Sequence, residues 1–365
     1  RVQVPPGSRE SHRLDAQAMI TPRPDGQACI PVGTESMSDY AGMVVQEASG
    51  SACAKAILLG EHAVVYGEPA IAVPLPELRA TAISGPGLAG RGVEVIAHDL
   101  GDARYGRESG DERGRGLLRA ALRTAAALLG EGIEPDMVIE LSSLIPVARG
   151  LGSSAAVAAA IVRATVASMG TTLAPDRVSP LVFECETLFH GTPSGVDNTV
   201  VSFERAVWFQ RGAPHEFLTI GAPLCLLLAD TGAPSRTSDT VGRVRDARQH
   251  EPKRVNAALG EIGALVCQAR DFLAVGNLAA VGRTMNANHE LLRTLGVSTP
   301  TLDALVLAAQ RAGAWGAKLC GGGGGGCMVA LVPDQAVAAV RRALKLAGAA
   351  ALYEATVEPV SALAS

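Results

Sequence analysis

A loop rich in glycine and serine lies within residues 146–162. Gly150 and Gly152 let backbone N–H groups approach a ligand closely, and the hydroxyls of Ser153 and Ser154 follow directly. The alanines that come next predict a helix, whose first turn offers unpaired N–H groups and the positive end of a dipole. The loop therefore predicts a binding site for an anion, with phosphate as the first candidate. A serine cap on an ordinary core helix is the alternative.

Three charged side chains lie in other glycine-punctuated segments. Lys55 is within an apolar run that ends in Gly60-Glu61-His62, and a lysine buried in such a run needs a partner. Glu186 and Asp197 flank a loop of glycine and proline. Phosphoryl transfer requires a phosphate cradle, a hydroxyl and a carboxylate that hold a metal, a second carboxylate and a cation.

Common nucleotide fingerprints do not match this chain. The P-loop pattern G-x-x-x-x-G-K-[ST] is absent, as are the H-R-D and D-F-G elements of protein kinases. The six glycines at 321–326 satisfy G-x-G-x-x-G trivially, and they do not open a helix. A phosphate site here must therefore be of another kind.

Composition sets the broad class. A length of 365 residues favours two domains, and 48% hydrophobic content predicts a sizeable core. The net charge of −4 argues against a nucleic-acid partner, and no run approaches the roughly eighteen apolar residues of a membrane span. Seven scattered cysteines without C-x-x-C spacing are typical of reduced thiols, so we expect a cytoplasmic protein.

Hydrophobic periodicity predicts strands and helices in both halves of the chain. Expected strands are 53–59, 63–66, 70–74, 80–83, 93–97, 137–142, 200–210, 223–229, 316–320, 327–332 and 351–360. Expected helices are 117–129, the alanine-rich run before Gly170, 175–189, 238–249, 252–274, 277–294, 301–312 and 335–347. This mixture predicts an α+β protein of two lobes, 51–220 and 221–365, after a flexible leader at 1–50.

Four ordered motifs resemble the GHMP kinase superfamily and, within it, the mevalonate kinase family. They are K-x-I-L-x-G-E-H-A-V-V-x-G at 55–67, P-x-x-x-G-L-G-S-S-A at 146–155, H-G-x-P-S-G-V-D-N at 190–198 and K-L-x-G-x-G-G-G-G at 318–326. The resemblance covers residues 51–360. Galactokinases would have G-E-H-T-D-Y in the first motif, and homoserine kinases lack the aspartate that Asp197 matches.

The resemblance implies a fold, a reaction and two cofactors. The fold would have a ribosomal-protein-S5-like N-terminal lobe and a ferredoxin-like C-terminal lobe with added helices. The reaction would be phosphorylation of the primary hydroxyl of mevalonate by ATP with Mg²⁺, giving 5-phosphomevalonate for isoprenoid synthesis. Mevalonate would be the small-molecule partner, with no nucleic acid and no membrane. The sequence leaves a homodimer open.

The resemblance also implies residue roles. Asp197 would accept or orient the proton of the attacking hydroxyl beside Lys55, and Ser154 and Glu186 would hold Mg²⁺, although Glu184 competes with Glu186. The nucleotide-binding set would be Pro146, Gly150, Leu151, Gly152, Ser153, Ser154 and Ala155. The substrate-binding set would be Lys55, Glu61, His62, Asp197, Ser235, Thr237 and Gly322. The third glycine motif would pack its backbone against the phosphate loop.

Several positions near these motifs remain open. Related kinases often have Thr-Gly-Ala where this chain has Cys320-Gly321-Gly322, and loss of the alanine methyl predicts a looser contact with substrate. Lys318 is expected near solvent at the nucleotide mouth. Arg149 either touches a phosphate or braces the loop, whereas His289 and Asn286 are expected to brace helices.

Two other functions remain as alternatives. The first is phosphomevalonate kinase or another small-alcohol kinase, and a basic pocket for a substrate phosphate would favour the former. His62 and Thr237 on the substrate side are not basic at neutral pH. The second is a non-catalytic ligand sensor, which would not need the intact set of Lys55, Ser154, Glu186 and Asp197.

Overall fold

An antiparallel pair of long strands is the centre of the first sheet. The structure, a computed structural model, describes residues 45–106, 112–130, 133–190, 193–235 and 237–361. In chain order the strands are β1 (Ala48–Leu59), β2 (Ala70–Pro86), β3 (Val93–Ala97), β4 (Ala103–Tyr105), β5 (Met137–Ser143), β6 (Val207–Phe209) and β7 (Glu216–Phe217). They are arranged as β4-β3-β5-β2-β6-β7, and β1 pairs with β2 outside this path.

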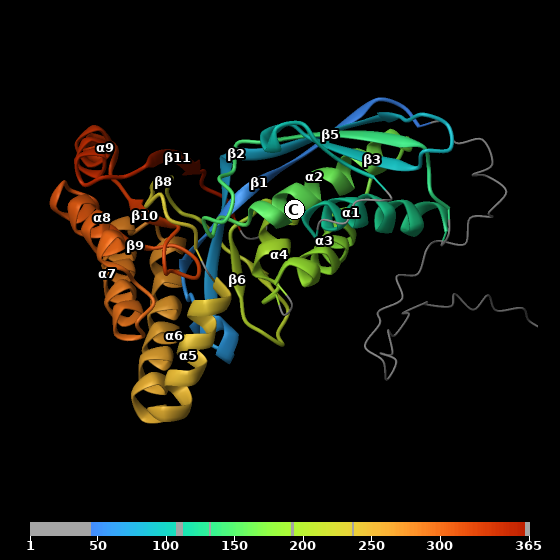
Figure 1. The fold of residues 1–365 in the computed structure, drawn as a ribbon. Helices are drawn as coiled ribbons and strands as arrows, with labels where there is room; N and C mark the ends of the chain where they lie inside the picture. Colours follow the sequence, from blue (N-terminus) through green and yellow to red (C-terminus); the bar gives the residue numbers. More distant parts are fainter. Residues whose placement is uncertain (1–44, 107–111, 131–132, 191–192, 236, 362–365) are drawn as a thin grey trace, which may run out of the picture. The chain divides into compact units, whose positions relative to one another are not determined.

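Helices cover one face of this sheet (Figure 1). They are α1 (Glu112–Leu129), α2 (Ser153–Ser168), α3 (Pro175–His190) and α4 (Val196–Phe203). Helix α2 packs directly on β1 and β2, because its alanines leave little bulk between helix and strand. At Gly50 a β-carbon would lie 2.3 Å from the Ala164 nitrogen, so only glycine permits this approach.

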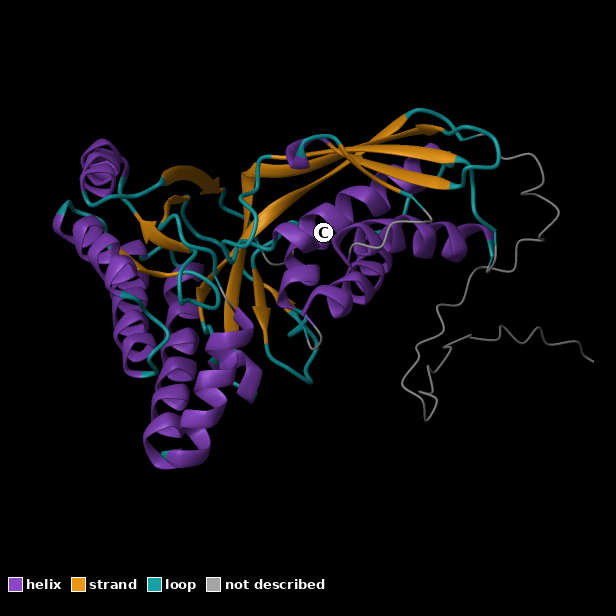
Figure 2. Ribbon diagram, viewed as in Figure 1, coloured by secondary structure: helices purple, strands orange, loops and turns teal. Residues whose placement is uncertain are grey.

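The second sheet is antiparallel throughout, with strand order β11-β8-β10-β9. Its strands are β8 (Leu224–Asp230), β9 (Gly316–Leu319), β10 (Cys327–Leu331) and β11 (Ala351–Val357). The accompanying helices are α5 (Thr237–His250), α6 (Pro252–Ala274), α7 (Leu278–Thr294), α8 (Pro300–Arg311) and α9 (Val337–Leu346). This is the ferredoxin-like order with helices inserted between its first two strands. The predicted α+β class is confirmed, and Figure 2 shows the mixture of helices and strands.

Two predicted strands are wrong, and both lie next to the site. Residues Ala63–Tyr66 form a 3-10 helix that Gly67 ends at φ 94°, so the first motif turns where a strand was expected. The predicted strand 200–210 begins in α4, which ends at Phe203, and only Val207–Phe209 is a strand. Burial of the β-branched residues of α4 outweighs their weak helix propensity.

The boundaries of the early segments also differ from the prediction. Strand β1 begins at Ala48, within the expected leader, and the rest of that leader up to residue 44 lies outside the described residues. Strand β2 is one element of 17 residues where two short runs were expected, and it bends at a register shift opposite Cys53 and Ala54. Within the described residues, none of the helices is both long and apolar enough to cross a bilayer.

Candidate active site

The phosphate loop reaches α2 through a series of left-handed residues. Ala148, Gly150 and Gly152 have φ values of 57°, 80° and 70°. Gly152 is the N-cap of α2, and no side chain caps the helix. The alternative of a serine cap is therefore wrong, because Ser153 and Ser154 are the first two residues of the helix itself. Their backbone N–H groups and hydroxyls lie at the positive end of the helix dipole.

Lys55 and Asp197 form an ion pair beside this loop. Lys55 Nζ lies 2.8 Å from Asp197 Oδ1 and donates to the Gly150 carbonyl at 3.3 Å. The backbone N–H of Lys55 donates to the Leu151 carbonyl at 3.0 Å, which fixes strand β1 against the loop. Burial lowers the pKa of Lys55, but the Asp197 charge and hydrogen bond help to outweigh it, so the net pKa is raised. The lysine therefore stays positive.

Glu186 brings a second carboxylate to the same place. Glu186 is 2% exposed. Burial and the charge of Asp197 raise its pKa to about 7, although the hydrogen bond with Ser154 and the charge of Lys55 act in the opposite direction. The competitor Glu184 instead pairs with Arg123 Nε at 2.9 Å. Of the two carboxylates, only Glu186 therefore faces Ser154 and Asp197.

Glu61 forms a buried ion pair with Lys318 of β9. Glu61 is 1% exposed and Lys318 is fully buried, so the expectation that Lys318 lies near solvent is wrong. The second oxygen of Glu61 accepts a hydrogen bond from Asn288 Nδ2 at 3.4 Å. Because both oxygens have protein partners, the geometry favours a supporting role for Glu61, and the substrate contact stays a prediction.

His62 connects the motif at 55–67 to the glycine-rich motif at 318–326. The Nε2 atom of its ring lies 2.9 Å from the Gly322 carbonyl oxygen, so this nitrogen must carry the proton and donate it. Burial lowers the pKa of His62 to about 4, and the positive charges of Lys318 and Arg243 act in the same direction. The hydrogen bond to Gly322 acts against this shift but does not outweigh it. The ring is neutral at pH 7. His62 itself has a φ of 62°, which turns the chain into the 3-10 helix.

Gly322 packs against the start of α5. A β-carbon at Gly322 would lie 2.7 Å from Thr237 Oγ1 and 3.0 Å from Thr237 Cα. Thr237 therefore occupies the space of the missing methyl on this side, and the predicted looser contact with substrate is not tested. Gly322 thus contacts both Thr237 and His62.

The third glycine motif packs against the phosphate loop, which confirms that prediction. A β-carbon on Gly321 would lie 3.1 Å from both Cα and O of Gly150. Ser235 joins the phosphate loop to the glycine-rich motif at 318–326. Its N–H donates to the Ala148 carbonyl at 2.8 Å, and its hydroxyl donates to the Gly323 carbonyl at 3.0 Å. With these bonds Ser235 holds the loops together, and its predicted substrate contact is not tested.

Arg149 braces the phosphate loop. Its Nε donates to Asp230 Oδ2 at 2.6 Å and its Nη2 to the Gly232 carbonyl at 3.3 Å, at the end of β8. The other residues of the predicted nucleotide-binding set differ in burial. Leu151 and Ala155 are buried, whereas Pro146 and Ser153 are half-buried.

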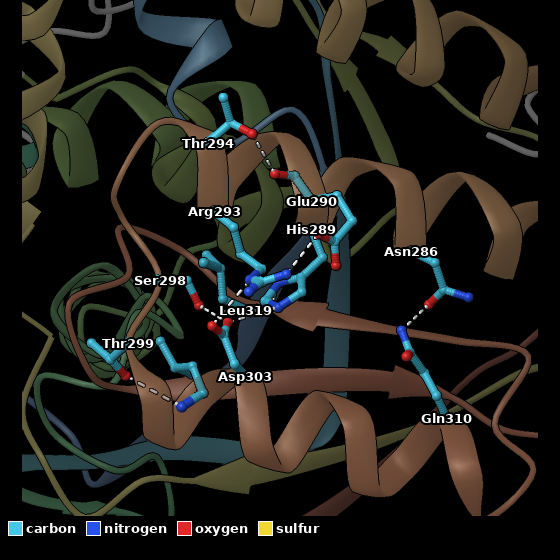
Figure 3. A network of polar contacts seen from close by, with 11 residues as sticks. Asn286, His289, Glu290, Arg293, Thr294, Ser298, Thr299, Asp303, Gln310 and Leu319 are labelled. Carbon is cyan, nitrogen blue, oxygen red and sulfur yellow. Dashed lines mark hydrogen bonds and ion pairs between the residues drawn. The ribbon is translucent and has the colours of Figure 1, made fainter.

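A polar network between α7 and α8 fixes strand β9 (Figure 3). His289 Nδ1 accepts from the Leu319 N–H at 3.3 Å, and its Nε2 lies 3.2 Å from Asp303 Oδ1. Asn286 Oδ1 accepts from the Ala317 N–H at 2.8 Å and from Gln310 at 2.7 Å. Both residues brace helices and strand, as predicted. The network thereby holds Lys318, which lies between the two bonded N–H groups of β9.

The structure adds two residues that sequence reasoning missed. Arg243 of α5 lowers the pKa of His62, and its guanidinium lies 3.4 Å from the position of a β-carbon on Gly324. Asn288 of α7 is buried and bonds to Glu61. Neither belongs to one of the four motifs, although Arg243 lies in the same helix as the predicted substrate contact Thr237.

Comparison with known proteins gives a consistent family. The family model for the N-terminal domain of GHMP kinases matches residues 116–204, and the model for their C-terminal domain matches 269–350. The mevalonate kinase of Thermococcus sibiricus is 35% identical over 320 residues, covering 82% of this chain and 92% of that protein. The mevalonate kinase of Pyrococcus horikoshii is 35% identical over 327 residues, covering 84% and 94%.

A solved structure agrees with these relatives. The mevalonate kinase of L. major in complex with R-mevalonate matches with a TM-score of 0.75 and 26% identity, over 86% of this chain and 96% of that one. The relatives are similar over most of their length. The chain therefore belongs to the GHMP kinase superfamily and, within it, to the mevalonate kinase family.

Proposed function

We propose that this chain transfers the γ-phosphoryl group of ATP to the primary hydroxyl of mevalonate, giving 5-phosphomevalonate and ADP. The observation that carries the proposal is the ion pair of Lys55 and Asp197, 2.8 Å apart and next to Gly152 at the start of α2. A base and a cation beside an anion-binding helix terminus are what phosphoryl transfer to an alcohol requires.

The reaction would proceed between these groups. The hydroxyl oxygen of mevalonate forms a bond to the γ-phosphorus while the bond from that phosphorus to the β–γ bridging oxygen breaks, and ADP leaves. Asp197 orients the hydroxyl and accepts its proton. Lys55, buried and positive, stabilises the charge on the transferring group, and its compact ammonium suits a point charge better than the fork of an arginine.

The donor set near Ser154 fits a magnesium ion. Glu186 and Asp197 are two neighbouring carboxylates, and burial together with the charge of Asp197 raises the pKa of Glu186. Ser154 and Glu186 would hold the ion, which when bound would neutralise charge on the phosphate oxygens. Among the residues that the structure describes, no group of three or more acidic, histidine or cysteine side chains forms a metal site. This suits Mg²⁺, which commonly takes one or two carboxylates and completes its shell with phosphates and water.

The substrate would lie against His62, Thr237 and Gly322. His62 is neutral and already donates to the Gly322 carbonyl, so its ring offers no positive charge to a phosphate on the substrate. Arg243 supplies one exposed guanidinium nearby, which suits the single carboxylate of mevalonate. We propose Arg243 as the partner of that carboxylate.

Phosphomevalonate kinase is the nearest alternative activity. Its substrate carries a phosphate in place of the hydroxyl and needs more positive charge at the reacting end. A ligand sensor of the same fold would gain nothing from a buried, raised-pKa Glu186 next to Asp197, so the charged set favours an enzyme.

The test is a coupled ADP-release assay with mevalonate, phosphomevalonate, galactose and homoserine. We expect turnover with mevalonate that depends on Mg²⁺, and none above background with the other three alcohols. Turnover with another acceptor and none with mevalonate would remove the substrate assignment and leave the kinase. Absence of turnover with all four would favour the sensor.

We also propose the two lobes as 45–220 and 221–361. The last strand of the first sheet, β7, ends at Phe217, and the first strand of the second sheet, β8, begins at Leu224. Limited proteolysis that cuts between these strands and releases two stable fragments would support the boundary, and cleavage only elsewhere would oppose it.

A further inference from the structure

An ion-pair cluster lies at the opposite end of α4 from Asp197. Helix α4 has eight residues, with Asp197 in its first turn and Glu204 directly after its last. Glu204 accepts two hydrogen bonds from Arg79 of β2, one on each oxygen, both at 2.9 Å. Arg163 of α2 donates to the same carboxylate at 2.7 Å. One carboxylate is thus held by two guanidinium groups from two different elements.

Arg163 also caps the C-terminal end of helix α4. Its Nη2 donates to the carbonyl of Ser202 at 2.7 Å and, more weakly, to that of Val201 at 3.4 Å. These are carbonyls of the last turn, which have no partner within a helix. A cation at this end is also favoured by the helix dipole. Arg163 therefore fixes the C-terminal end of α4 onto α2.

The same two arginines hold strand β1. Arg163 donates to the Ser51 carbonyl at 2.5 Å, and Arg79 donates to the Ser51 hydroxyl through Nε at 3.2 Å and Nη2 at 3.0 Å. Ser51 lies four residues before Lys55 in the same strand. The pairing of β1 with β2 shifts register between Cys53 and Ala54, so the ladder alone does not carry a fixed register from Ser51 to Lys55.

The cluster therefore touches three of the elements that present groups of the reaction, whereas Glu186 lies on α3. Helix α2 begins with Ser153 and Ser154, strand β1 carries Lys55, and α4 carries Asp197. None of the three cluster side chains touches the proposed site itself. Their positions suggest an action through the backbone elements.

Glu204 adopts a conformation that its own residue type does not favour. Its φ is 49°, in the left-handed region that is strained for a residue other than glycine. A carboxylate at a helix C-terminus also opposes the dipole. Burial raises the pKa of Glu204, but the two arginines outweigh it and the net pKa is lowered, so the carboxylate remains charged at neutral pH. Such strain persists where surrounding contacts impose it.

We propose that Glu204, Arg79 and Arg163 are positioning residues for the phosphoryl-transfer centre. This inference rests on the proposed function. The cluster sets the direction of α4 relative to α2 and β1, and thereby the place of the Asp197 carboxylate beside Lys55. Helix α4 is about 12 Å long and moves as a unit, so a tilt at Glu204 displaces Asp197 at the other end. A displacement of about 1 Å in a reacting group can cost about 100-fold in rate.

The first test is the variant Glu204→Gly. Glycine accepts the positive φ, so the backbone is kept and only the carboxylate is lost. We expect kcat for mevalonate phosphorylation to fall about 10- to 100-fold, while KM for ATP and for mevalonate change less than about twofold. Glu204→Asp keeps a carboxylate and should recover part of kcat. The matched control is Glu216→Gln, which breaks an exposed pair with Arg270 at 2.6 Å and should leave kcat unchanged.

The second test separates positioning from general stability. In the Asp197→Asn background the base is already lost, so Glu204→Gly should lower the residual rate by less than about twofold. An equal fold loss in both backgrounds, or a wild-type kcat in Glu204→Gly, overturns the inference. A wild-type chain that does not phosphorylate mevalonate contradicts the proposed function instead, and the same variants are then compared with the acceptor that does react.

Discussion

Gly152 faces Lys55 so closely that a β-carbon on the glycine would lie 2.9 Å from Lys55 Cγ and 3.1 Å from Cε. The same β-carbon would lie 3.6 Å from Asp197 Oδ2. The loop is therefore packed onto the Lys55–Asp197 pair at a point where the chain has no side chain. This contact joins the motif at 146–155 to the motifs at 55–67 and 190–198.

Gly152→Ala tests this contact. The methyl would push Lys55 away from Asp197, so we expect kcat to fall about 100-fold. Gly170→Ala, at the other end of α2, is the matched control because Gly170 has a similar φ, 73° against 70°, and open space around its β-carbon position. Both variants should lose about 1–2 kcal/mol of stability from backbone strain, and only Gly152→Ala should lose activity. Equal activity in the two variants would contradict the close packing.

Gly322→Ala tests the departure from the Thr-Gly-Ala pattern. The new methyl meets Thr237 Oγ1 at 2.7 Å, so the start of α5 must move away from the substrate side. We expect KM for mevalonate to rise several-fold while KM for ATP is unchanged. Gly85→Ala, which has open space, is the control. An unchanged KM for mevalonate would mean that Thr237 does not line the substrate site.

The buried pair of Lys318 and Glu61 should matter strongly for stability. Lys318→Met leaves Glu61 as a buried carboxylate without its ion-pair partner, which typically costs about 3–5 kcal/mol. The double variant Lys318→Met/Glu61→Gln removes both charges and should be more stable than the single variant. Urea unfolding of the wild type, the single variant and the double variant measures the order of their stabilities. A single variant that is no less stable than the double would argue against the ion pair.

His62 should contribute a pH-dependent part of the stability. Its pKa is about 4 in the folded chain, below its ordinary value of 6.5, so unfolding takes up a proton between these values. The associated stability is complete above pH 6.5 and is lost as the pH falls toward 4, by about 3 kcal/mol in all. His62→Gln keeps a donor for Gly322 and should reduce this loss between pH 7.5 and pH 5 in urea unfolding.

His98→Gln is the control for that measurement. The carboxylates of Asp102 and Glu140 accept hydrogen bonds from this exposed histidine and raise its pKa, so its pH dependence has the opposite sign. His289, whose pKa burial lowers, keeps part of the acid sensitivity in every variant. A His62→Gln profile parallel to the wild type would mean that His62 is not buried as a neutral ring.

The sequence allowed the helices and the motif positions to be predicted because these depend on local patterns. Helix α6 was predicted at its observed bounds, since its apolar spacing and initial proline are local signals. The 3-10 helix at Ala63–Tyr66 was missed because a four-residue apolar run reads equally well as a strand. Helix α4 was missed because its β-branched residues are helical only through burial.

The partners of charged residues could not be predicted in the same way. Lys318 and Glu61 are 257 positions apart, and nothing in either motif indicates that one neutralises the other. The same holds for Glu204 with Arg79 and Arg163, which belong to no motif. Arg149 was left between two roles because the acceptor that decides it, Asp230, lies at the end of a distant strand. Such pairs follow from the tertiary fold.

The most direct test of the account is the rate of phosphoryl transfer to mevalonate by Asp197→Asn, compared with the wild type in the coupled assay. Asparagine keeps the shape of the side chain but loses both the charge that pairs with Lys55 and the acceptor for the proton. We predict a fall in kcat of about 10²- to 10⁴-fold with KM for ATP nearly unchanged. Near-normal turnover of Asp197→Asn would contradict the central role of the Lys55–Asp197 pair.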